Sequence, residues 1–191
     1  LSPDGTSAWA AGGVTICTAA GNQYGPSLAS DGAGGAIAAW RDYRSADADI
    51  YTQRVLPDGT VAWAADGVVV CTAAGVQVSP KAVSDGANGA IVVWRDMRAG
   101  EYNADLYAQR VLSDGTTAWV TDGVALTKAG GDQWFQAIAS DGEGGAIVAW
   151  QDERTDDSRI YAQRVLSDGT VAWTTDGVWV SAEIAHGYSP D

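Results

Sequence analysis

The feature that most constrains the fold is a sequence motif that occurs three times in the chain. SDGAGGAIAAWRDYR at residues 30–44 returns as SDGANGAIVVWRDMR from residue 84 and as SDGEGGAIVAWQDER from residue 140. The tryptophans set the period, since Trp40, Trp94 and Trp150 are spaced by 54 and 56 residues. A fixed period of this kind is typical of an array in which each repeat is one supersecondary unit packed on its neighbours.

Each repeat has the local pattern of four short strands, which we call A to D in chain order. In the first repeat, strand-like runs cover residues 26–31, 35–42 and 50–56, and Asp-Gly or Gly-Gly pairs separate them. Strand D is expected over residues 61–72, with a bulge or kink at Asp66-Gly67. Because no run has the spacing of an amphipathic helix, the pattern predicts an all-β fold.

Short antiparallel strands repeated at this spacing are typical of propeller blades. We therefore predict a β-propeller of four-stranded antiparallel blades, with about 54–56 residues per blade. A β-solenoid is the alternative, but its rungs are usually much shorter. We expect one propeller domain or fragment over residues 1–191, with three full blades and parts of a fourth. Its predicted parts are the outer strand of an incomplete blade at 1–25, blades at 26–79, 80–135 and 136–185, and the start of the next blade at 186–191.

The incomplete blade raises the question of how the ring is completed. A propeller generally needs at least about four blades, and an unclosed arc leaves strand edges that tend to pair with another chain. The sequence begins with Leu1 and shows no leader, so it reads as a mature form or an excised piece. We expect the chain either to belong to a longer propeller or to complete its ring with other copies.

The phrase GGAIVAWQDERTDDSRIYAQRVLSDGTVAW resembles a blade type of large secreted and surface proteins of bacteria, where it forms multi-bladed propellers. The resemblance covers essentially the whole chain, because SDGxxGAIxxW, WxDxR and IYxQRVL recur at fixed offsets. It implies the propeller fold and an extracellular or cell-surface location. It implies no catalytic residue, because propellers host lectins, hydrolases, adhesins and scaffolds alike.

The charge of the chain limits its partners. With 24 acidic and 11 basic residues, the formal net charge is −13, and there is no basic run. Binding to nucleic acid or to an anionic membrane surface is therefore not expected, and no apolar run reaches the roughly 20 residues of a membrane helix. Cys17 and Cys71 occupy equivalent positions of successive repeats, which Thr127 and Ser181 fill later, so we expect no disulfide between them.

Residues that recur in every repeat are predicted to serve the blade itself. The tryptophan that ends strand B is expected to pack between blades, and the Asp and Arg that follow share a strand face and form an ion pair. These structural residues are Trp40, Asp42, Arg44, Trp94, Asp96, Arg98, Trp150, Asp152 and Arg154.

Residues that differ between the repeats gather in the D–A and B–C connections, which open on one face of a propeller. Variable loops on a rigid scaffold are where binding usually occurs. Aromatic rings beside amides and carboxylates suit a sugar, which stacks on a ring and bonds through its hydroxyls; the alternative is that these rings only plug the top of the propeller. The predicted ligand-binding residues are Gln23, Tyr24, Tyr43, Gln77, Glu101, Tyr102, Gln133, Trp134, Phe135 and Tyr188.

No cofactor is expected. Acidic pairs in or beside the B–C connections could supply oxygen ligands to Ca²⁺, but they lack the spacing of a calcium loop, so a solvated acidic surface is favoured. The pairs are Asp47 with Asp49, Glu101 with Asp105, and Asp156 with Asp157.

Three functions remain from these observations. The favoured one is a non-enzymatic extracellular binding module for carbohydrate. The alternative is a structural or adhesive building block that self-assembles through its incomplete blade. A glycosidase-like enzyme is the second alternative, with Glu143 and Glu153 as its carboxylates. Histidine-based catalysis has little basis, because His186 is the only histidine.

Overall fold

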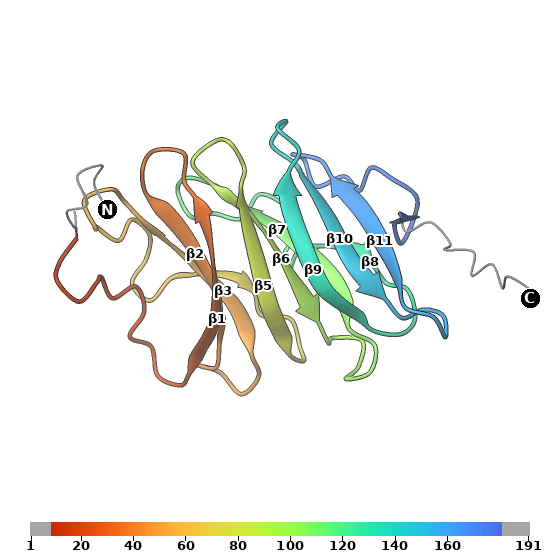
Figure 1. Ribbon diagram of the computed structural model, residues 1–191. Helices are drawn as coiled ribbons and strands as arrows, with labels where there is room; N and C mark the ends of the chain where they lie inside the picture. The colour runs from red at the N-terminus through yellow and green to blue at the C-terminus, as the bar shows by residue number, and fades with distance from the viewer. Residues whose placement is uncertain (1–8, 181–191) are drawn as a thin grey trace, which may run out of the picture.

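The computed structural model describes residues 9–180, and within them the chain forms twelve strands and no helix (Figure 1). The strands make three four-stranded antiparallel sheets, each in simple chain order, which confirms the all-β prediction and the four-stranded unit. No membrane-spanning helix occurs among these residues. The strands are β1 (Gln23–Ser30), β2 (Ala36–Asp42), β3 (Asp49–Val55) and β4 (Val68–Cys71) in the first sheet; β5 (Gln77–Ser84), β6 (Ala90–Asp96), β7 (Asp105–Val111) and β8 (Val124–Thr127) in the second; and β9 (Gln133–Ser140), β10 (Ala146–Asp152), β11 (Arg159–Val165) and β12 (Val178–Trp179) in the third.

Strand A of each sheet begins earlier than predicted. In β1 the pairing with β2 skips Gly25 and Pro26 and resumes with Tyr24 opposite Arg41. The skipped residues form a bulge, and the same irregularity interrupts β5 and β9. A bulge re-aims the side chains beside it. The strand therefore extends into the segment that the sequence assigned to the D–A connection.

Strand D is shorter than the predicted run at 61–72. Only β4 pairs as a strand there, while Val61 makes an isolated bridge to Val55. Between these two points Asp66 and Gly67 have positive φ angles of 63° and 89°. The predicted kink is therefore a full turn that divides the segment.

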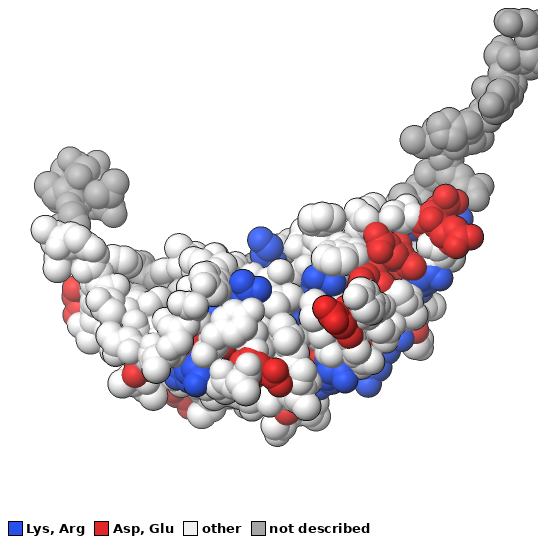
Figure 2. Space-filling model, turned by 90° about the horizontal axis from the view of Figure 1, so that it is seen from below, with Lys and Arg blue, Asp and Glu red and all other residues white. Residues whose placement is uncertain are grey.

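The three sheets stack face to face along an arc. β1 lies beside β5 and β5 beside β9, so the A strands line one side of the stack (Figure 1). Seen from below, the described residues form a crescent (Figure 2). Within residues 9–180 the stack is open at both ends, and no sheet pairing closes it into a ring.

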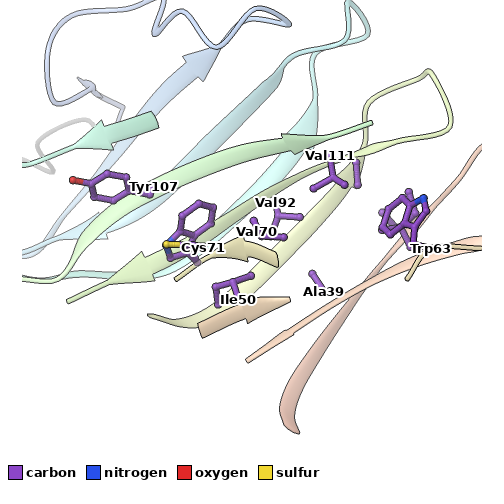
Figure 3. Packing of buried hydrophobic residues seen from close by; sticks show 12 residues of the cluster. Ala39, Ile50, Trp63, Val70, Cys71, Val92, Tyr107 and Val111 are labelled. Atoms are coloured by element: carbon purple, nitrogen blue, oxygen red, sulfur yellow. The ribbon is translucent and has the colours of Figure 1, made fainter. Parts of the chain in front are cut away.

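Apolar side chains from adjacent sheets interlock to form the core. Ile50 and Cys71 of the first sheet pack with Val92 of the second (Figure 3). The same cluster contains Trp94. The next residues along β6, such as Val93, turn the other way and pack against the third sheet. This two-sided burial explains the unbroken apolar run of strand B. Burying one tryptophan, at about 150–250 Å² and about 25 cal/mol per Å², stabilises the fold by an upper figure of about 4–6 kcal/mol.

Hydrogen bonds also join one sheet to the next. The indole N–H of Trp63 donates to the Ser113 carbonyl at 3.0 Å, and that of Trp119 donates to the Ser167 carbonyl at 3.1 Å. The ring of Trp63 lies so close to Gly115 that a Cβ there would stand 2.9 Å from it. Only glycine fits this position, because its φ is also +88°.

The Asp–Arg pair forms in all three sheets. In the second sheet, Arg98 binds Asp96 through two bonds of 2.8 and 2.6 Å, and the Trp94 indole donates to the same carboxylate at 2.8 Å. Arg98 also donates to the Asp122 carbonyl at 2.9 Å, so it ties the turn before strand D to strand B. The residues that recur in every repeat therefore make contacts within each sheet and between neighbouring sheets.

Candidate functional site

The variable connections lie at one end of the sheets. The D–A segment bonds directly to the start of the following B–C connection: the Met97 amide donates to the Val76 carbonyl at 2.9 Å, and the Glu153 amide to the Asp132 carbonyl at 3.0 Å. Figure 2 looks onto this end, with Lys and Arg side chains near the middle of the crescent and a group of Asp and Glu side chains over the third sheet.

The three glutamines predicted to bind ligand have a different place. Gln77 and Gln133 are completely buried, and Gln23 is half-buried. The Gln77 amide donates to the carbonyls of Ala73 and Gly75, at 3.0 and 3.1 Å. Gln23 and Gln133 make the same pair of bonds in their own connections. The prediction of a ligand contact is wrong for Gln77 and Gln133, because these amides hold the D–A connection from inside.

Two of the predicted aromatic residues meet on the first sheet. Tyr24 and Tyr43 pack edge to face with ring centroids 5.9 Å apart. The Arg41 guanidinium lies 5.2 Å from each ring centroid. Tyr24 remains 45% exposed, so this cluster presents one open ring beside a cation.

Two more meet in a groove between β5 and β9, which we call the β5–β9 groove. Trp134 and Phe135 lie with ring centroids 6.3 Å apart. The groove has a volume of about 320 Å³. Across it, the Gln136 amide donates to the Ser79 carbonyl at 2.5 Å and joins the two strands. Its lining residues are Ser79, Lys81, Arg95, Trp134, Phe135 and Gln136.

The backbone at Phe135 explains how its ring reaches the surface. Phe135 occupies the bulge of β9 with a φ of 53°, where β1 has Gly25 with a φ of 60°. A left-handed conformation is unusual for a bulky side chain and costs of the order of 1–3 kcal/mol. The ring is nevertheless 79% exposed, so it recovers little of this cost through burial. The equivalent Ser79 of β5 has a φ of 55°, so the conformation belongs to the bulge of each repeat, and Phe135 differs from its equivalents by its exposed aromatic ring.

Trp134 is fixed from two sides. The Arg95 guanidinium lies 3.5 Å from the centroid of its ring, and the indole N–H donates to Glu153 at 3.2 Å. Arg95 in turn donates to the Gln133 carbonyl at 2.7 Å. Burial lowers the pKa of Arg95 below its ordinary value, although an arginine keeps its charge at neutral pH. The groove therefore contains a preorganised indole ring above a buried cation.

The other predicted site residues are not drawn into this groove. Glu101 and Tyr102 lie on the B–C connection of the second sheet, and Tyr102 is 84% exposed. Tyr188 lies outside the described residues.

The two glutamates proposed as a glycosidase pair lie at opposite ends of β10. Glu143 precedes the strand and accepts a bond from Arg164 at 2.6 Å, whereas Glu153 follows it beside Trp134. Seven extended residues separate them, a distance of roughly 20 Å, whereas glycosidase carboxylates stand about 5–9.5 Å apart. That prediction is wrong for this pair.

Two of the three acidic pairs considered for Ca²⁺ divide between surface and interior, whereas Asp156 and Asp157 are both exposed. Asp49 and Asp105 are buried at the starts of β3 and β7, and the Ser45 hydroxyl donates to Asp49 at 2.5 Å. Among the described residues no group of three or more His, Cys, Asp or Glu is arranged to hold a metal ion.

Four residues line the groove but were not predicted: Ser79, Lys81, Arg95 and Gln136. Lys81 stands where the other repeats have Ser27 and Ala137, so it differs between the repeats as the predicted residues do. It lies within a strand, however, whereas the predicted binding residues were those that vary in the connections between strands.

Fold and site together define an all-β protein built of stacked four-stranded antiparallel sheets, with a groove between neighbouring A strands. No protein-family model matches the chain. No curated protein matches it either. Among solved structures it is similar to an endo-arabinase from Bacteroides thetaiotaomicron, with a TM-score of 0.48, 14% sequence identity and alignment over 84% of this chain. The chain spans 60% of the length of that structure.

Proposed function

We propose that the three sheets are consecutive blades of a β-propeller and that the protein is a non-enzymatic module that binds carbohydrate in the β5–β9 groove. The observation that carries the proposal is the pairing of Trp134 and Phe135 at the mouth of this groove, with Phe135 exposed on a strained backbone. The C–H face of a sugar stacks on such rings. Ser79 and Gln136 supply polar groups beside them, as orientation of a ligand requires.

The stacking of the sheets supports the propeller part of this proposal. Each sheet packs on the next through residues at equivalent positions of the repeat, and the A strands line the inside of the arc. Repetition of one interface along an arc is the way in which blades surround a central channel. An extracellular or cell-surface location belongs to the same proposal and rests on the resemblance of the repeat to bacterial surface blades.

A non-enzymatic role agrees with the residues that line the groove. Its lining residues include no carboxylate, and the nearest one that contacts them, Glu153, already accepts hydrogen bonds from Trp134 and Gln151. General acid–base chemistry needs a group that is free to move a proton at the substrate. The groove is therefore better suited to holding a ligand than to cleaving it.

The test is a glycan-binding screen followed by calorimetry on single variants. We expect Trp134→Ala and Phe135→Ala each to weaken binding about fivefold or more, because loss of one stacked ring costs about 1–3 kcal/mol where nucleobases stack on aromatic side chains. Val120→Ala is the control: Val120 is 63% exposed and lies outside the groove, in the turn before β8, where its carbonyl accepts a bond from the Gly123 amide. Unchanged affinity in both groove variants, with the fold intact by circular dichroism, would overturn the proposal.

Self-association is a second candidate function, favoured by the outer face of the third sheet. Ile147 of β10 is 37% exposed on this face. The equivalent residue of the second sheet, Ile91 of β6, is completely buried because the third sheet packs on it. An exposed apolar sheet face of this kind usually marks an interface.

A further inference from the structure

The charge of the β5–β9 groove differs from that of the chain. The chain has 24 acidic and 11 basic residues, yet the groove is lined by two cations, Lys81 and Arg95, and by no acid. A local reversal of sign against a net charge of −13 attracts an anion to the groove. The ligand that suits the groove therefore combines a negative group with an apolar face.

The two cations differ in how far their charge is already balanced. Arg95 is 5% exposed, donates to the Gln133 carbonyl, and lies 3.5 Å from the Asp132 carboxylate. Its guanidinium is also covered by the Trp134 ring. Arg95 is thus a positioning residue that supports the indole ring.

Lys81 carries the unbalanced charge. Its side chain is exposed on β5, and it takes part in no ion pair within residues 9–180. The chain has one other lysine, Lys128, which lies outside this groove in a hollow that it shares with Asp176. Lys81 is therefore the group in the groove that is available to an anionic ligand.

We infer that the groove recognises a sugar bearing a carboxylate, in other words a uronate residue of an acidic polysaccharide. The sugar ring lies against Phe135 and Trp134, and its carboxylate pairs with Lys81. One lysine matches one negative charge, while Asp132 and Glu153 close by disfavour a more highly charged ligand. This inference rests on the proposed function, since it names the sugar class for the same groove.

The experiment compares two ligands with the same sugar backbone, an oligogalacturonide and its methyl ester, in which a methyl group on each carboxyl removes the charge. By calorimetry we expect the wild-type protein to bind the acid about five- to tenfold more tightly than the ester, as a partly exposed charge-assisted bond provides. Lys81→Met keeps the aliphatic stem and should remove this preference, together with the weakening of acid binding by salt. Lys128→Met is the matched control and should leave both affinities unchanged.

The outcomes separate the inference from the proposed function. Equal affinity of the wild-type protein for acid and ester, a preference that survives in Lys81→Met, or tighter binding of a sulfated glycan would overturn the uronate assignment. If neither oligogalacturonide form binds but a neutral glycan does, the inference fails and the proposed function stands. Loss of binding to both forms in Phe135→Ala is expected, and binding of no glycan at all by the wild-type protein would overturn both.

Discussion

Asp105 is a buried carboxylate that lacks a full set of partners. It is 2% exposed at the start of β7, and its Oδ1 atom has no hydrogen-bond partner among the described residues. Burial, opposed in part by Lys128, raises its pKa to about 6. Because the folded state holds this proton more tightly than the unfolded state does, the contribution of Asp105 to stability is full below about pH 4 and is lost as the pH rises through about 6.

We expect Asp105→Asn to stabilise the fold at neutral pH. The amide keeps the shape of the neutral carboxyl group, so the variant should match the wild type near pH 4 and exceed it at pH 7 by about 2–3 kcal/mol. Chemical denaturation at pH 4, 5, 6 and 7 measures the difference. A difference that does not change over this range would contradict the titration of Asp105 in that window.

Asp42→Asn provides a control of opposite sign. Burial of Asp42 favours its neutral form, but hydrogen bonds from Arg44 and Trp40 outweigh it and lower its pKa. Its stabilising effect is therefore present above the unfolded pKa and is lost as the pH falls through the folded one. This variant should be less stable than the wild type at pH 7, and the deficit should shrink in acid.

Single residues show what the sequence could and could not predict. The period of two along a strand predicts the Asp–Arg contact, and the pair forms, but Arg44 lies beyond the end of β2 and meets Asp42 in a turn, where its amide also donates to the Asp42 carboxylate at 2.9 Å. The burial of Gln77 has no such local rule, because it depends on a D–A connection that wraps around its amide. From the sequence alone, a polar residue in a variable connection is predicted to be exposed, because the way the connection wraps around it is not known.

At the scale of the strand, the bulge in β9 links stability to binding. Phe135 holds a φ of 53° that glycine adopts freely, and its ring buries little surface. We expect Phe135→Gly to raise stability by up to about 1 kcal/mol, because it relieves the left-handed strain while adding some backbone entropy to the unfolded chain. Glycan binding should be lost at the same time. Urea denaturation and calorimetry on one sample measure both.

Phe135→Ala separates strain from the ring. It removes the ring but keeps a Cβ in the left-handed conformation, so it should lose binding without the gain in stability. If Phe135→Gly instead destabilises the protein by more than about 1 kcal/mol, the ring serves as a plug in the stack rather than as a ligand contact.

The elements also differ in how well their limits could be predicted. Strands B and C are unbroken apolar or branched runs, and β2, β3 and their equivalents lie where the sequence places them. Strand A begins earlier because pairing resumes beyond a bulge, and strand D is cut by a turn that lies against the preceding indole ring: a Cβ on Gly67 would stand 2.6 Å from Trp40. The ends of strands A and D are set by contacts between strands, and the local sequence pattern does not predict such contacts.

At the scale of the whole molecule, the two ends of the stack are halves of one repeated interface. Between sheets, Trp119 is 9% exposed and its indole donates to the next sheet, whereas the equivalent Trp173 on the third sheet is 37% exposed. Likewise Arg110 reaches the Ser167 carbonyl of the next sheet at 3.1 Å, whereas Arg164 turns to Glu143. The third sheet thus presents the same docking groups, with no further sheet among the described residues to receive them.

The first sheet presents part of the opposite half, because residues 9–18 already cover some of it: the Trp9 indole donates to the Pro57 carbonyl at 2.9 Å, as the Trp63 indole does to Ser113. Trp40 is 3% exposed and packs against Ile16 and Cys17, and an apolar hollow of about 260 Å³ remains beside these residues. In the second sheet, the equivalent Trp94 is covered by Ile50 as well as by Cys71. The hollow lies where strands of a preceding sheet would pack.

Complementary ends of this kind predict head-to-tail association of the 191-residue chain. A contact between different surfaces closes into a ring or grows into a filament. We expect the mass measured by light scattering on a sizing column to rise with concentration, and Ile147→Lys to hold the protein at the monomer mass, because it places a charge in the apolar contact. Val120→Lys, which alters a valine that is more exposed than Ile147 and lies in the turn before β8, should associate like the wild type. A wild-type protein that stays monomeric at every concentration would show that these faces do not bind each other, and would leave the groove between β5 and β9 as the functional surface to pursue.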